Sequence, residues 1–241
     1  MPPVDLPVEI LFEVIKSIPL GSPREFATLA LVNKTFFKFA EKRLYCHLQM
    51  DLRDPTRLIR AVKCLRTLAG RRSAAEAVRS ISVSWDERMG QAFQCLLVES
   101  LEHTTGLLTL SLANRPTRSS GTTTFFPLFP KTLPLNFLPK LSILEADTQH
   151  TVIQLVPYRP VHTVSIQARG IDAGLIRFVV DALHLSTIPI QHLHFKIAVS
   201  GPKEILPTLM KIVMPEKLPN LVTLDLQWEC HSPSKLDRVI D

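Results

Sequence analysis

The first 48 residues carry apolar side chains at the spacing of short amphipathic helices. A first helix is predicted over residues 6–18, from the spacing of Ile10, Leu11, Val14, Ile15 and Ile18. A second is predicted to open at Ser22-Pro23, because serine caps a helix and proline suits its first position. Asn33 is expected to cap a third helix with one apolar face: Phe36, Phe37, Ala40, Leu44 and Leu48.

A second apolar pattern, of the form L-x-x-L-x-L, recurs through residues 76–241. Neighbouring copies begin 20 to 34 residues apart, as the steps from 141 to 161 and from 107 to 141 show. Each copy is predicted to be a buried strand, and the repetition predicts a stack of similar units. The six copies are Val78/Ile81/Val83, Leu107/Leu110/Leu112, Leu141/Leu144/Ala146, Val161/Val164/Ile166, Ile190/Leu193/Phe195 and Leu221/Leu224/Leu226.

Helices are predicted between these strands, so that each repeat supplies one strand and one helix. A single repeat cannot bury its own apolar face, and neighbours are therefore expected to share a continuous core. Residues 115–136, rich in Pro, Gly and Thr, are predicted to form a long loop whose Phe125, Phe126 and Phe129 pack onto the stack. The predicted helices span residues 89–102, 150–156, 172–185 and 203–213.

Alternate side chains of a strand point to opposite faces, so the residues between the apolar positions are expected to form one polar face. In a curved stack of repeats this face is the concave surface that binds partners. Arginine is not concentrated there, which disfavours a pocket for a phosphorylated target. The candidate target-binding residues are Glu145, Asp147, Gln167, His192, His194, Lys196, Asp225 and Gln227.

Charge separates the two parts of the chain. The 241 residues have a net charge of +6, and residues 1–80 account for it, with 14 Lys and Arg against 8 Asp and Glu. Residues 53–72 hold seven basic residues and one acid, on a predicted linker helix at 55–69. A solvated helix face explains such a stripe, and attraction to an acidic partner or nucleic acid is the alternative. Aromatic residues do not interleave with it, which disfavours base stacking.

Catalytic and metal-binding motifs are missing from the sequence. It contains no G-x-S-x-G, P-loop, G-x-G-x-x-G or H-E-x-x-H, and the pair His192 and His194 lacks further ligands nearby. We therefore expect no catalytic residues, metal or cofactor, and a protein that is not an enzyme. The four cysteines are dispersed, which indicates free thiols and a location in the cytoplasm or nucleus. The sequence contains no run of about 18 apolar residues, so we expect no membrane-spanning helix.

The N-terminal pattern resembles an F-box over about 40 residues. The matching segments are Leu6-Pro7-x-Glu9-Ile10-Leu11-x-x-Val14-Ile15, Leu29-x-Leu31-Val32-Asn33-Lys34-x-Phe36, Ala40 and Leu44-Tyr45. The resemblance implies docking to a Skp-type adaptor, and through it to a cullin–RING ubiquitin ligase. It implies the docking residues Leu6, Pro7, Ile10, Leu11, Val32 and Phe36. Arg24-Glu25-Phe26 replaces the usual acidic-Leu pair, and Phe36 or Phe37 replaces the usual Trp.

An apolar surplus agrees with a docking role, because so small a unit hides only about 60% of its chain surface. The apolar side chains that the unit cannot bury must pack against either the rest of this chain or a partner protein. We favour a partner protein. The later repeats resemble leucine-rich repeats, but the asparagine expected in each is absent, so the turns need other hydrogen-bond partners. We expect an irregular solenoid.

The resulting prediction is an α/β chain with an F-box-like domain at 1–48, a basic linker helix at 49–75 and a leucine-rich-repeat-like strand–helix solenoid at 76–241. Its expected function is to recruit an unknown target protein to an SCF-type ubiquitin ligase. The alternatives are an F-box scaffold acting outside the ligase, and nucleic-acid binding through residues 53–72.

Overall fold

The computed structural model describes residues 7–19, 23–32, 34–85, 91–114, 129–130, 133–168, 173–198 and 218–229. Over these residues the chain forms eight helices and one seven-stranded sheet. Every neighbouring pair of strands is parallel, and the strands follow one another in chain order from β1 to β7. The predicted α/β class is confirmed.

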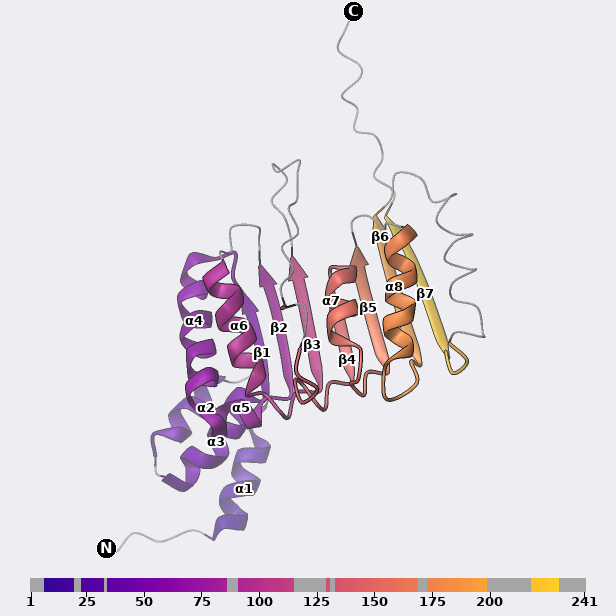
Figure 1. The fold of residues 1–241 in the computed structure, drawn as a ribbon. Coiled ribbons are helices and arrows are strands. Elements are labelled where there is room, and N and C mark those ends of the chain that lie inside the picture. Colours follow the sequence, from indigo (N-terminus) through magenta and orange to yellow (C-terminus); the bar gives the residue numbers. More distant parts are fainter. Residues whose placement is uncertain are drawn as a thin grey trace, which may run out of the picture.

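The sheet carries its helices on one face (Figure 1). The strands are β1 His47–Asp51, β2 Ser80–Trp85, β3 Thr109–Asn114, β4 Ile143–Ala146, β5 Thr163–Ala168, β6 His192–Ala198 and β7 Thr223–Glu229. The covering helices are α4 Pro55–Gly70, α6 Gln91–Glu102, α7 Gln149–Leu155 and α8 Ala173–His184. The short helix α5, Arg72–Ala77, joins α4 to β2. Each helix after α5 connects two neighbouring parallel strands in chain order, as a crossover connection requires.

The predicted strands pair in the register that the repeated pattern implies. Ile81 lies opposite Leu110, which lies opposite Leu144, and the row continues through Val164, Leu193 and Leu224. The first five of these side chains are fully buried, whereas Leu224 is 36% exposed. Leu224 lies on the last strand of the sheet, which has a paired neighbour on only one side. The repeated L-x-x-L-x-L pattern therefore marks one continuous core.

The first strand, β1, was not predicted. Leu48 was expected on the third helix, but α3 ends at Cys46 and Leu48 lies in β1, opposite Ile81 of β2. The segment expected to be a linker helix, α4, packs onto β1 instead: Leu65 and Leu68 are fully buried in the main core. The sheet therefore begins before the expected boundary at residue 48, and α4 is the first of its covering helices.

Three helices form an N-terminal lobe, defined here as residues 7–46, at the β1 end of the sheet (Figure 1). They are α1 Val8–Ser17, α2 Pro23–Ala30 and α3 Lys34–Cys46, close to the predicted bounds. The expected capping residues Ser22 and Asn33 lie outside the described residues. The lobe has a small core of its own, in which Ile15, Phe26 and Ala40 are buried, apart from the core beneath the sheet.

One aromatic of the predicted long loop packs as expected. Phe129 is 2% exposed, and its ring lies 6.0 Å from that of Phe137 in the main core. Phe125, Phe126 and the helix predicted over 203–213 lie outside the described residues.

Candidate protein-binding surfaces

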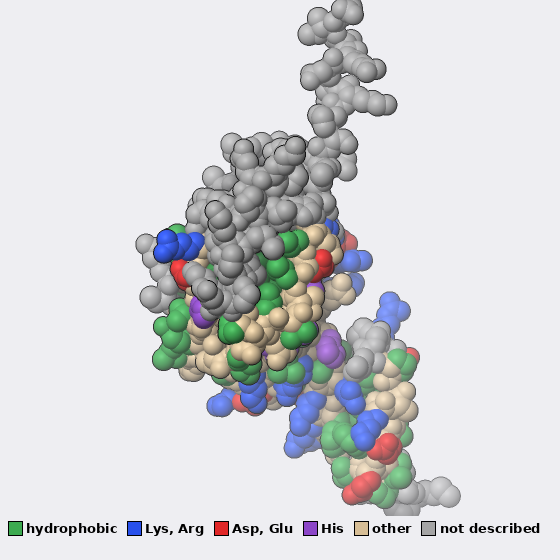
Figure 2. All heavy atoms as spheres, turned by 90° about the vertical axis from the view of Figure 1, so that its right-hand side faces the viewer, with side chains coloured by type: hydrophobic (Ala, Val, Ile, Leu, Met, Phe, Trp, Pro, Cys, Tyr) green, Lys and Arg blue, Asp and Glu red, His purple; other side chains and the backbone are tan. Residues whose placement is uncertain are grey.

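The N-terminal lobe exposes a large share of its apolar side chains. Ile10 is 50% exposed, Val32 is 61% exposed and Leu31 is 86% exposed. Figure 2 shows hydrophobic side chains at the surface of this lower part of the molecule, beside Lys and Arg. The other exposed large hydrophobic residues of the lobe are Val8, Phe12, Val14 and Phe37. So many exposed apolar side chains on one small body are typical of an interaction surface.

The expected docking residues divide into three groups. Pro7, Ile10 and Val32 are exposed. Phe36 is half-buried against the core of the lobe, and Leu11 is 6% exposed, so it is buried within the free chain. Leu6 lies outside the described residues. Their docking role stays a prediction.

Leu31 was not among the expected docking residues, yet it is the most exposed large apolar residue of the described chain. It follows directly after α2, with its backbone N–H bonded to the carbonyl of Thr28. The sequence could have indicated Leu31 as a docking residue, because it lies in the Leu29-x-Leu31-Val32 segment that resembles an F-box.

The two flanks of α1 differ in how far the chain covers them. Ile10 and Val14 are four residues apart and therefore share one flank. Phe12 lies on the other flank, where its ring is 5.6 Å from that of Phe39 and the Lys16 ammonium is 4.5 Å above it. The Ile10 flank is therefore the better candidate for a partner.

Glu41 joins the lobe to the rest of the chain. This carboxylate on α3 is buried, accepts a hydrogen bond from the Arg71 guanidinium and lies 3.4 Å from the Ser73 hydroxyl. The Arg71 guanidinium also lies 5.5 Å from the centre of the Phe37 ring. Because a buried carboxylate needs charged or polar partners, these contacts hold α3 against α5.

The polar face, the side of the sheet opposite the helices, carries the expected target-binding residues. Along one row, Glu145 lies opposite Ser165, Ser165 opposite His194, and His194 opposite Asp225. In the next row Gln167 lies opposite Lys196, and Lys196 opposite Gln227. Asp147 follows directly after β4, with its N–H bonded to the carbonyl of Leu112, and His192 lies opposite Thr223. All eight residues are half-buried or exposed.

Side-chain contacts group part of this face. The Asp225 carboxylate accepts a hydrogen bond from the Gln227 amide at 3.0 Å and lies 3.5 Å from His194 Nδ1. Glu145 is two strands away from His194, about 10 Å at ordinary strand spacing. The acid–histidine pair and the separate Glu145 suit hydrogen bonding to a protein segment that crosses the strands.

Neither a metal-binding cluster nor a membrane-spanning helix is found among the described residues. No group of three or more His, Cys, Asp or Glu among them is arranged to hold a metal ion. Within the same part of the chain, no helix is both long and apolar enough to cross a membrane.

Comparison with known proteins gives no family: no protein-family model matches this sequence, and no curated protein matches it either. A functional assignment therefore depends on the residues and surfaces described above. The two surfaces on which a proposal can be based are the exposed apolar surface of the N-terminal lobe and the polar face of the sheet.

Proposed function

We propose that this protein is a non-catalytic adaptor that recruits a target protein to an SCF-type ubiquitin ligase. The N-terminal lobe binds a Skp-type adaptor as an F-box does, and through it a cullin. The rest of the chain is a solenoid of the leucine-rich-repeat type, and its polar face binds the target. Other subunits carry out the transfer of ubiquitin.

The exposure of Ile10, Leu31 and Val32 carries this proposal. These side chains lie in the segments that resemble an F-box, and at least half of each is exposed in the free chain. Covering a large apolar side chain contributes about 1.5–3 kcal/mol, so a partner that covers several gains substantial affinity. The lobe also keeps a core separate from that of the sheet, which leaves its outer surface available.

The polar face supports the second half of the proposal. Its rows of Ser, Thr, Gln, His and acidic residues extend across neighbouring strands in register. Such a surface offers donors and acceptors to an extended or loop segment of a target, as the inner surfaces of solenoids do.

The docking surface is tested by substituting exposed apolar residues, which should leave the fold of the chain unchanged. The double variant Ile10→Asp, Val32→Asp places charges on two exposed positions. We expect capture of a purified Skp-type adaptor to fall by at least about tenfold, since desolvated apolar anchors dominate such interfaces. The measurement is the dissociation constant by surface plasmon resonance, with far-ultraviolet circular dichroism as the check on folding.

Ile59→Asp is the matched control, because Ile59 on α4 is 61% exposed, as Val32 is, but lies outside the lobe. It should leave adaptor binding unchanged. Equal binding of the double variant and the wild type would overturn the docking assignment. Co-purification of the cullin with wild type distinguishes a ligase subunit from an F-box scaffold that binds the adaptor alone.

A further inference from the structure

The outer edge of β1 has no paired strand within the described sheet. β1 pairs with β2 on one side and is the first strand in the sheet order. The carbonyl of Cys46 accepts a bond from the N–H of Arg79, and the N–H of Leu52 donates to the carbonyl of Ser84. Because backbone groups alternate in direction along a strand, Leu48 and Met50 also face β2.

The N–H and C=O groups of His47, Gln49 and Asp51 therefore point to the outer edge. The described turn, loop and cap hydrogen bonds include none to the backbone of Gln49 or Asp51. An exposed edge of this kind is a template for a further strand.

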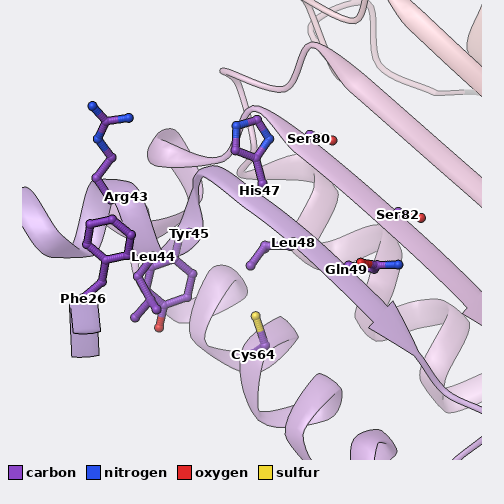
Figure 3. A pocket seen from close by; sticks show the side chains of 10 residues that line it. All are labelled: Phe26, Arg43, Leu44, Tyr45, His47, Leu48, Gln49, Cys64, Ser80 and Ser82. Carbon is purple, nitrogen blue, oxygen red and sulfur yellow. The ribbon is translucent and has the colours of Figure 1, made fainter. Parts of the chain in front are cut away.

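Two hollows follow this edge, and neither was predicted from the sequence. One, with a volume of about 730 Å³, lies between β1 and the end of α3 (Figure 3). The other, about 530 Å³, lies between β1 and α4. Leu48, Gln49 and Cys64 line both, so the hollows adjoin along the strand. In Figure 3 Leu48 points toward Cys64, which gives the hollows an apolar floor.

Arginines surround the hollows. Arg43 lines the first, and Arg57 and Arg60 line the second. Among the described residues, Asp51 is the single acid that lines either hollow, and Arg53 already pairs with it at 2.6 Å. Hydrogen bonding to Arg53 lowers the pKa of Asp51 to about 2, so its charge is matched within the chain. Arg57 lies 3.5 Å from Asp54, but both side chains are largely exposed, and such a pair contributes little.

We propose that the outer edge of β1 binds an extended acidic peptide segment of a partner protein as an added strand. The backbone of the segment bonds to His47, Gln49 and Asp51, its apolar side chains enter the hollows over Leu48 and Cys64, and its carboxylates pair with the arginines. Main-chain bonds supply affinity and the pockets supply selectivity in this mode of recognition. The first hollow includes Arg43 of the lobe, but none of the proposed docking or target-binding residues lines either hollow. The proposal therefore does not depend on the ligase assignment.

The test uses the full chain and a labelled peptide, acetyl-Glu-Glu-Val-Val-Glu-Glu-Val-Val-amide, followed by fluorescence anisotropy. As a strand, this peptide presents both glutamate and valine on each of its faces, so both residue types reach the hollows. Binding should weaken at least about tenfold in Arg57→Glu, Arg60→Glu, since two attractive charges become repulsive. The control Lys63→Glu, Arg66→Glu makes the same change in net charge on exposed residues of α4 that line neither hollow. It should weaken binding by less than about threefold, since these exposed charges are screened by solvent and do not line the hollows.

Strand addition has its own signature. The peptide N-methylated at alternate residues should bind at least about tenfold more weakly, because it lacks the donors for one edge. Gln49→Pro removes an outward N–H but none that faces β2, so it should block binding and keep the circular dichroism spectrum. Hydrogen exchange at Gln49 and Asp51 should slow on adding the parent peptide.

Three results would overturn the proposal: no binding of the parent peptide, equal loss in the two charge variants, or equal binding of the N-methylated peptide. An oligouridylate of equal charge that binds more tightly than the peptide would instead assign the arginines to RNA.

Discussion

At the scale of single residues, Arg159 is a buried hydrogen-bond donor in the turn that precedes β5. It is 3% exposed, and its guanidinium donates to the carbonyls of Phe137 at 2.7 Å and Pro157 at 2.8 Å. It also reaches the carbonyls of Leu155 and Pro134, and lies 5.7 Å from the Phe137 ring. Burial lowers the pKa of Arg159, but arginine keeps its charge in proteins. The Arg159 guanidinium thus joins two turns of the chain through its hydrogen bonds.

Arg159→Met should lower the free energy of unfolding by about 3 kcal/mol, because buried carbonyls lose their donors. Urea unfolding followed by circular dichroism measures the change. Arg79→Met is the control, since Arg79 also bonds to the carbonyls of Glu76 and Val78 but is exposed, where water replaces the lost donor. Equal losses in both variants would show that burial does not set the cost.

No periodicity in the sequence indicates Arg159, because its partners are main-chain carbonyls up to 25 residues away. The exposed Ile10 and the buried Leu11 show a related limit. Both are apolar neighbours on one predicted helix, and only the packed structure separates the one that faces inward.

At the scale of elements, the apolar periodicity located most of the described helices and strands, because each repeat buries one strand face and one helix stripe. It missed β1, since α3 runs directly into it and Leu44 and Leu48 also fit a helix face. Tyr45-x-x-Leu48-x-Met50 has the spacing of the other strand cores and begins 33 residues before Val78, which was the available signal. The outer edge of β1 was missed with it.

The start of α7 provides a prediction at this scale. Thr148 caps this seven-residue helix, with its hydroxyl accepting from the N–H of Thr151 at 3.2 Å. Thr148→Ala should lower the free energy of unfolding by about 1 kcal/mol, because the N–H of Thr151 loses its acceptor. Thr148→Ser keeps the oxygen and should lose far less in the same urea titration. A serine variant as unstable as the alanine variant would assign the effect to the methyl group.

At the scale of the whole molecule, two cores of unequal size share one chain. The core beneath the sheet runs from Met50 to Leu218, whereas the lobe buries fully only Ile15, Phe26 and Ala40 among the members of its core. Burial of so few side chains contributes little free energy, so the lobe depends on its junction with α5 and on any partner. The sequence indicated two units, but the junction required long-range contacts that no local pattern encodes.

The buried carboxylate of Glu41 should therefore set the stability of the lobe and leave the sheet alone. Glu41→Gln keeps the shape but removes the charge that pairs with Arg71, a loss of about 1–2 kcal/mol. Hydrogen exchange should then quicken in α1 to α3 and stay unchanged in β2 to β6, because the two cores do not share their buried residues. Glu76→Gln is the control, as its 2.7 Å pair with Arg72 is exposed and contributes little. Equal acceleration across the sheet would mean that lobe and sheet unfold as one cooperative body.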